Sequence, residues 1–177
     1  SIKSQSFLDQ SYLANIIQIL DEFLRQSSDQ AAISRIIDSL IENDSKFSFC
    51  LIHIASTCGY PKLHRLVSLM ILKSCIIRMK EDNKDFNDMI LRMIYEILGE
   101  RDAQSVLKQH AIILMVNLII KNGECIRNLH ETFLKMLEND EIASFALDGM
   151  VELMEKKGFL LSGEVLNILG FFIQNFS

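Results

Sequence analysis

The sequence predicts an all-α protein, an α-solenoid built from about four and a half antiparallel helix pairs. Between turn-forming clusters, apolar residues recur at the i, i+3, i+4, i+7 spacing of one helix face, and no segment shows the period of two that is typical of strands. The first helices of successive pairs are expected to begin near residues 9, 46, 85, 124 and 162. That interval, roughly 37 to 39 residues, is a helical-repeat period, and because one pair cannot bury both of its faces, the pairs must stack.

Each predicted helix lies between two turn clusters. In the first helix, Leu13, Ile16, Ile17, Leu20, Phe23 and Leu24 form one apolar face. Asp29 and Asp140 are expected to cap helix starts, Pro61 to take a first helical position, and Gly99, Gly123 and Gly158 to end helices. The nine predicted helices lie near 9–26, 29–42, 46–57, 61–79, 85–98, 102–121, 124–138, 140–156 and 162–176.

These helices group into units near 9–42, 46–79, 85–121 and 124–156, followed by the first helix of a fifth unit at 162–176. The unit length is close to that of HEAT and armadillo repeats. We expect one repeat block over residues 1–177. Because the last segment is apolar with almost no charge, whereas a terminal repeat should present a polar outer face, we expect a fragment of a longer solenoid or a partner that covers this end.

Composition argues against several function classes. The net charge is −5, and the 18 Lys and Arg residues are scattered, so no basic block favours nucleic acid. No apolar run reaches the ~18 residues of a membrane span. The four cysteines have no C-x-x-C spacing, which indicates reduced thiols in a cytosolic or nuclear protein.

The sequence gives no support for catalysis. The four histidines lie far apart, and no phosphate-binding loop or nucleophile elbow occurs. Cys50 and His53 could supply two metal ligands from one helix, but two ligands are half a site and packing is the favoured interpretation. We therefore predict a protein that is not an enzyme and that uses neither metal nor cofactor.

The fourth predicted helix, 61–79, has two contrasting sides on a helical wheel. One side is expected to face the core and carries Leu63, Leu66, Val67, Met70 and Ile77. The other forms a narrow stripe, which is either part of the concave surface of a solenoid or an ordinary solvated flank. The stripe consists of His64, Ser68, Ile71, Cys75 and Arg78.

Two cations in this helix, Arg65 and Lys73, are predicted to be structural. A long cationic side chain can lay its stem on apolar neighbours while its head meets a carboxylate or the carbonyls at a helix end in the adjoining repeat. Lys108 falls in the third unit where Arg65 falls in the second, which supports the repeat.

The stretch FSFCLIHIASTCGYPKLHRLVSLMILKSCI, residues 47–76, resembles the N-terminal segment of karyopherin-beta nuclear transport receptors, with the importin-beta and transportin branches most similar. It has an apolar helix, a short loop, Arg65, six residues, Leu72 and Lys73, then Ser74 where family members commonly have Asn, and Ile76. Residues 106–158 resemble the third and fourth repeats of those receptors, with Lys108 in place of the usual Arg.

The resemblance implies a shuttling protein of cytoplasm and nucleus whose HEAT repeats hold the GTP-bound Ran GTPase on their second helices. Cargo and most nucleoporin sites would lie beyond this chain. Under this interpretation the residues expected to face the partner are His64, Ser68, Arg78, Lys108, Asn117 and Asp148. The alternative is a HEAT or armadillo-like scaffold of a vesicle-coat adaptor or regulatory subunit, which would bind peptides without regard to the nucleotide state of Ran.

Overall fold

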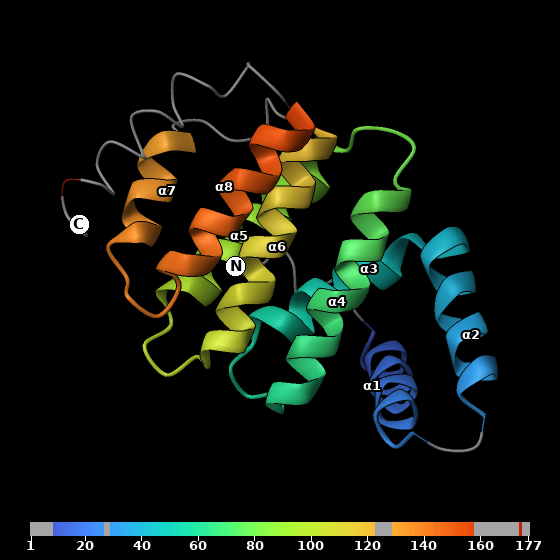
Figure 1. Cartoon of the computed structure of the whole chain (residues 1–177). Coiled ribbons are helices and arrows are strands. Elements are labelled where there is room, and N and C mark those ends of the chain that lie inside the picture. The colour runs from blue at the N-terminus through green and yellow to red at the C-terminus, as the bar shows by residue number, and fades with distance from the viewer. Residues whose placement is uncertain (1–8, 27–28, 123–128, 158–173, 175–177) are drawn as a thin grey trace. The chain divides into compact units, whose positions relative to one another are not determined.

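The computed structural model describes residues 9–26, 29–122, 129–157 and 174. Within these ranges the chain forms eight α-helices and no strand (Figure 1). The two helices of each predicted pair pack against each other, which confirms the all-α fold class and agrees with a helical-repeat solenoid. The helices are α1 (Gln10–Leu24), α2 (Gln30–Asn43), α3 (Ser45–Ser56), α4 (Lys62–Arg78), α5 (Lys84–Gly99), α6 (Ser105–Lys121), α7 (Leu129–Leu137) and α8 (Ala143–Lys157).

The first six helices lie within a few residues of their predicted bounds. The start predicted for α7 and the whole segment 162–176 lie outside the described residues, as do Gly123 and Gly158. Asp29 caps α2 as predicted, since its carboxylate accepts a hydrogen bond from the backbone N–H of Ala32 at 3.3 Å.

Three further residues that were predicted to start or end helices lie at or close to helix ends. Pro61 precedes the first residue of α4 instead of occupying it. Asp140 does not cap α8, which begins three residues later; in that turn it is Asn139 whose side chain accepts from the N–H of Glu141, at 3.0 Å. Gly99 is the last residue of α5, so it ends that helix as predicted.

The chain divides into two compact units, unit 1 (Ser1–Lys80) and unit 2 (Glu81–Ser177). The division falls between the second and third predicted pairs, so each unit holds two of them. A single continuous block over 1–177 stays a prediction.

Unit 1 contains α1 to α4. Its core lies where α4 packs against α3, α1 and α2, and α2 also packs against α3. The side chains of Leu20, Leu51, Ile54, Leu72 and Ile76 are fully buried there. Asp44 fixes one corner: its carboxylate caps α3 by accepting from the N–H of Lys46 at 2.9 Å, and it also accepts from the Tyr12 hydroxyl of α1 at 2.7 Å.

Unit 2 contains α5 to α8, with α6 packed against both α5 and α8, and α7 against α8. Ile90, Ile94, Met115, Leu118 and Ala146 are fully buried. Gly149 lets α8 approach α6 closely, because a Cβ at this position would lie 2.9 Å from Cγ2 of Val116. No ordinary side chain sits that close without displacing its neighbour.

A candidate protein-binding surface on the second helices

The face of α4 predicted to meet a partner is mostly inside the protein. Ser68 is fully buried and Ile71 nearly so, whereas Leu63, Met70 and Ile77, which were expected in the core, are exposed. The predicted orientation of α4 was therefore wrong. Ser68 cannot contact a partner protein in this fold, because its side chain is fully covered. In the described part of the chain its hydroxyl has no hydrogen-bond partner.

The reason lies in the residue pattern of α4. The helix is apolar nearly all round, so its pattern cannot say which side faces outward. Three neighbouring helices cover it, and the side that α1, α2 and α3 leave open happens to be apolar.

His64 contacts another helix instead of solvent. Its Nε2 lies 2.6 Å from Oδ1 of Asp21, a residue of α1. The ring is largely buried, and among the described residues its Nδ1 has no hydrogen-bond partner. His64 thus joins the second helix of pair 2 to the first helix of pair 1.

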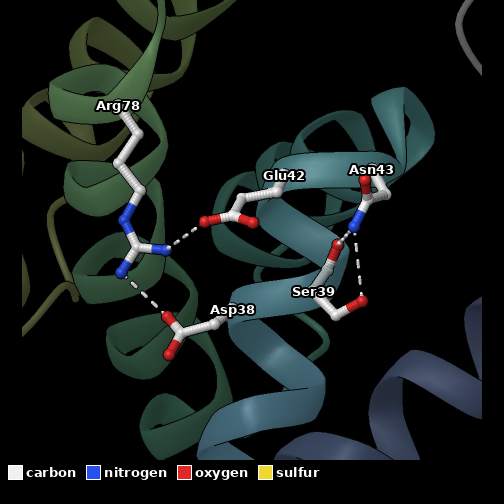
Figure 2. A network of polar contacts seen from close by, with 5 residues as sticks. All are labelled: Asp38, Ser39, Glu42, Asn43 and Arg78. Carbon is white, nitrogen blue, oxygen red and sulfur yellow. Dashed lines mark hydrogen bonds and ion pairs between the residues drawn. The ribbon is translucent and has the colours of Figure 1, made fainter.

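Arg78 makes a second link between the same two pairs. Figure 2 shows its guanidinium between two carboxylates of α2, with 2.8 Å to Oδ1 of Asp38 and 3.9 Å to Oε1 of Glu42. On the same helix Asn43 donates to the backbone carbonyl of Ser39 at 3.0 Å. All three ion-pair partners are exposed, so solvent screens them and the pairing is worth at most about 1 kcal/mol.

Arg65 is a structural residue, as predicted, but the bond observed lies within a pair. Only 5% of the residue is exposed, and its Nε donates to the carbonyl of Ala55 at 2.8 Å. Ala55 is the penultimate residue of α3, where carbonyls lack partners within the helix and the helix dipole favours a cation. Arg65 therefore ties α4 to the end of α3, and a bond from Arg65 to the adjoining pair stays a prediction.

The structure does not show the bond predicted for Lys73. The residue is exposed, and within the described ranges its side chain makes no hydrogen bond or ion pair. Lys73 falls on the open side of α4, beside Met70 and Ile77, where no helix of unit 1 supplies a carboxylate.

In unit 2, Lys108, which was expected to face a partner, makes an ion pair between the two helix pairs. It is 5% exposed, and its Nζ lies 3.9 Å from Oε2 of Glu141, in the turn before α8. Lys108 is the fourth residue of α6, just as Arg65 is the fourth residue of α4. Lys108 and Arg65 therefore correspond in burial as well as in their position along the helix.

The remaining two predicted contact residues differ in exposure. Asn117 is half-buried, and its side-chain amide donates to the carbonyl of Ile113 in the same helix at 2.8 Å. Asp148 is exposed on α8. Of the six residues predicted to face a partner, Asp148 is free to do so without giving up a contact that the structure shows.

Buried hydroxyl and thiol groups in unit 1 stay protonated at neutral pH. Burial raises the pKa of the Cys50 thiol to about 12 and that of Cys75 to about 11. Burial, followed by the hydrogen bond to Asp44, also raises the pKa of the Tyr12 hydroxyl. Because nucleophilic and metal-binding chemistry needs the thiolate, the raised pKa values make Cys50 and Cys75 poorly suited to either.

The described residues contain no cluster of three or more His, Cys, Asp or Glu side chains that could hold a metal ion. His53 instead packs edge-on against Tyr60, with ring centroids 5.9 Å apart. In the same ranges no helix has the length and apolarity needed to cross a membrane.

The exposed large apolar side chains show a pattern that the sequence reasoning missed. Of the eight in the described chain, Tyr95 alone lies on a first helix. The other seven lie on second helices: Ile36 on α2, Leu63, Met70 and Ile77 on α4, Val106 on α6, and Val151 and Met154 on α8. We call Leu63, Leu66, Met70 and Ile77 the α4 ridge; Leu66 is half-buried within it.

Comparison with known proteins identifies no relative. No protein-family model, curated protein or solved structure matches the chain.

Proposed function

We propose that this chain is a protein-binding block of helical repeats that holds its partner on the second helices of its pairs. The observation that carries the proposal is the concentration of exposed apolar side chains on α2, α4, α6 and α8. Three of these side chains lie on α4 and two on α8. Large exposed apolar side chains that lie together on one helix mark interaction sites, and buried apolar anchors supply most of the energy of protein association.

The partner that the resemblance to karyopherin-beta implies is the GTP-bound form of Ran. The support for it is the motif around Arg65 and Lys73, the matching position of Lys108, and an all-α fold of stacked pairs. The second helices, which carry most of the exposed large apolar side chains, are also the elements through which those receptors hold Ran. A nuclear transport receptor would shuttle between cytoplasm and nucleus.

Calorimetric titration tests this proposal. The 177-residue chain is titrated with Ran loaded with a non-hydrolysable GTP analogue, and separately with Ran loaded with GDP. Binding to the GTP form alone is the expected result. Absence of binding to either form, or equal binding to both, contradicts the transport proposal and favours the adaptor-type scaffold.

A matched pair of variants tests the surface itself. Met70→Glu places a charge on α4, and Tyr95→Glu places one on the first helix α5; both side chains are exposed, so neither change should unfold the protein. Met70→Glu should weaken binding of the GTP form by about tenfold, the effect of losing one apolar anchor, and Tyr95→Glu should leave it unchanged.

A further inference from the structure

The outward side of α4 carries a straight apolar row. Leu63, Met70 and Ile77 are 59%, 48% and 55% exposed, and they follow one another at intervals of seven residues. Seven residues are close to two helical turns, so the three side chains line up over about 21 Å. A narrow row with this spacing is the pattern of a helix–helix seam, in which a second helix lays its own apolar row alongside.

The charge beside this row is positive. From Lys62 to Lys80 the sequence contains no Asp or Glu, although the protein as a whole carries a net charge of −5. Lys62 and Lys73 are both exposed, and neither forms an ion pair within the described residues. Because they are eleven residues apart, which is close to three full turns, they lie on the same flank of the row.

The opposite flank of α4 is electrically matched. Arg78 lies there and is paired with Asp38 and Glu42 of α2, so those carboxylates are engaged within unit 1. Of the exposed charged residues of α4, Lys62 and Lys73 are therefore the two without a carboxylate partner in the described residues. A ligand that covers the ridge would meet apolar side chains along its centre and cations along one edge.

We propose that the α4 ridge binds an amphipathic helix of a partner protein, one with an apolar row flanked by acidic side chains. Its apolar row would pack on Leu63, Met70 and Ile77, and its carboxylates would reach Lys62 and Lys73. Complementary charge sets the direction and register of such a helix, while the buried apolar row supplies the affinity. The inference rests on the proposed function, because it names the chemistry of a partner for the same second-helix surface.

Two other occupants fit less well. If α4 packed antiparallel on the same helix of a second copy, the Lys62 and Lys73 flanks would face each other, which is unfavourable. In a parallel pair this flank would face that of Arg78, whose charge is already paired and which offers Lys62 and Lys73 no free carboxylate. An anionic membrane would attract Lys62 and Lys73, but interfacial helices use a broad apolar face with aromatic residues, whereas this row is one residue wide and contains none. Both remain outcomes of the test.

The probe is a fluorescein-labelled peptide of three heptads, about 21 residues, with Leu at positions a and d and Glu at e and g. Repulsion between the Glu side chains keeps the peptide monomeric. Its binding to the full 177-residue chain is followed by fluorescence anisotropy, beside a second peptide in which Lys replaces every Glu. We expect saturable binding of the Glu peptide, weakened by added salt, and at least tenfold weaker binding of the Lys peptide.

Variants assign the site. Lys62→Glu with Lys73→Glu should weaken the Glu peptide at least tenfold and strengthen the Lys peptide, which loss of folding could not do. Met70→Glu with Ile77→Glu should abolish binding. The control is Tyr95→Glu on the first helix α5, where an exposed apolar residue outside the second helices is changed and no effect is expected.

Several results would overturn the proposal. These are no saturation at roughly millimolar concentration, equal binding of both peptides, a Tyr95→Glu control as weak as the α4 variant, flotation of the chain with phosphatidylserine vesicles in place of peptide binding, or self-association through the ridge. The Ran titration is independent of this assay. Loss of peptide binding with intact binding of GTP-loaded Ran removes the ridge proposal alone, and the reverse result removes the transport proposal alone.

Discussion

The helices α4 and α6 are alike in sequence but differ in what they leave exposed. Both have 17 residues, both are apolar nearly all round, and both bury a cation as their fourth residue. Counted from that cation, the four positions of the α4 ridge correspond in α6 to Val106, which is 37% exposed, and to Gln109, Ile113 and Ile120, which are half-buried. An apolar second helix therefore shows that packing will occur, and its neighbours within the unit decide how much of the helix stays open.

The two buried cations make the sharpest test of this comparison. The Arg65 side chain donates a short hydrogen bond to the carbonyl of Ala55. The Lys108 side chain has a carboxylate at 3.9 Å and, among the described residues, makes no hydrogen bond. Arg65→Met leaves a buried carbonyl unpaired and should lower the free energy of unfolding by about 2–4 kcal/mol. Lys108→Met removes a charge that is costly to bury and keeps the stem, so stability should stay the same or rise.

Urea unfolding followed by circular dichroism measures both variants. The same loss of stability for Arg65→Met and Lys108→Met would contradict the contrast, because it would give the two cations one structural role. A large loss of Ran or peptide affinity by Arg65→Met at unchanged stability would move Arg65 from the fold to the binding surface.

The buried thiols of unit 1 predict a loss of stability in alkali. The pKa of a Cys thiol is ordinarily 9.0, and in the folded chain it rises to about 12 for Cys50 and about 11 for Cys75. Above about pH 9 the unfolded chain releases protons that the folded chain retains, so stability is full below that pH and falls as the pH rises through the folded values. Between pH 8 and pH 10 the loss should be about 1 kcal/mol for each thiol.

Denaturation at several pH values checks this expectation. The slope of the free energy of unfolding against pH reports ionisation, whereas a packing defect lowers stability equally at every pH. Replacing Cys50 and Cys75 by Ala will lower stability at every pH, but it should flatten the decline between pH 8 and pH 10. An unchanged slope in the double variant would show that other groups cause the decline.

The close contact of α8 with α6 at Gly149 in unit 2 predicts a moderate loss of stability when a side chain is added there. Gly149→Ala would place a Cβ 2.9 Å from Cγ2 of Val116, and a branched side chain in a packed interior moves at a cost. We expect a loss of about 1–2 kcal/mol, because overpacking outweighs the gain in helix propensity from Gly to Ala. Gly99→Ala is the matched control, since nothing lies within 4 Å of its added Cβ. Equal effects of the two changes on the thermal midpoint would mean that α8 yields easily.

The sequence predicted the helices well and the surface poorly, and the reason is physical. Helix positions follow from local periodicity and from caps such as Asp29. The partners of His64 and Arg78 lie 43 and 40 residues away, on α1 and α2, and no local pattern gives such contacts. The outward side of α4 was inverted for the same reason. One signal in the sequence could have indicated the outward side of α4. Leu63, Met70 and Ile77 recur every seven residues, with Lys62 and Lys73 on one flank and no acidic residue between Lys62 and Lys80.

Ser68 supplies the smallest predicted effect and a direct check on that inversion. Its hydroxyl is buried in α4 and, in the described part of the chain, accepts and donates no hydrogen bond. Because burying an unsatisfied polar group is unfavourable, Ser68→Ala should leave stability unchanged or raise it by up to about 1 kcal/mol, with no change in partner binding. Met70→Ala on the opposite side should leave stability nearly unchanged and weaken binding. If Ser68→Ala weakened binding and Met70→Ala did not, α4 would present its other side to the partner, as the sequence first suggested.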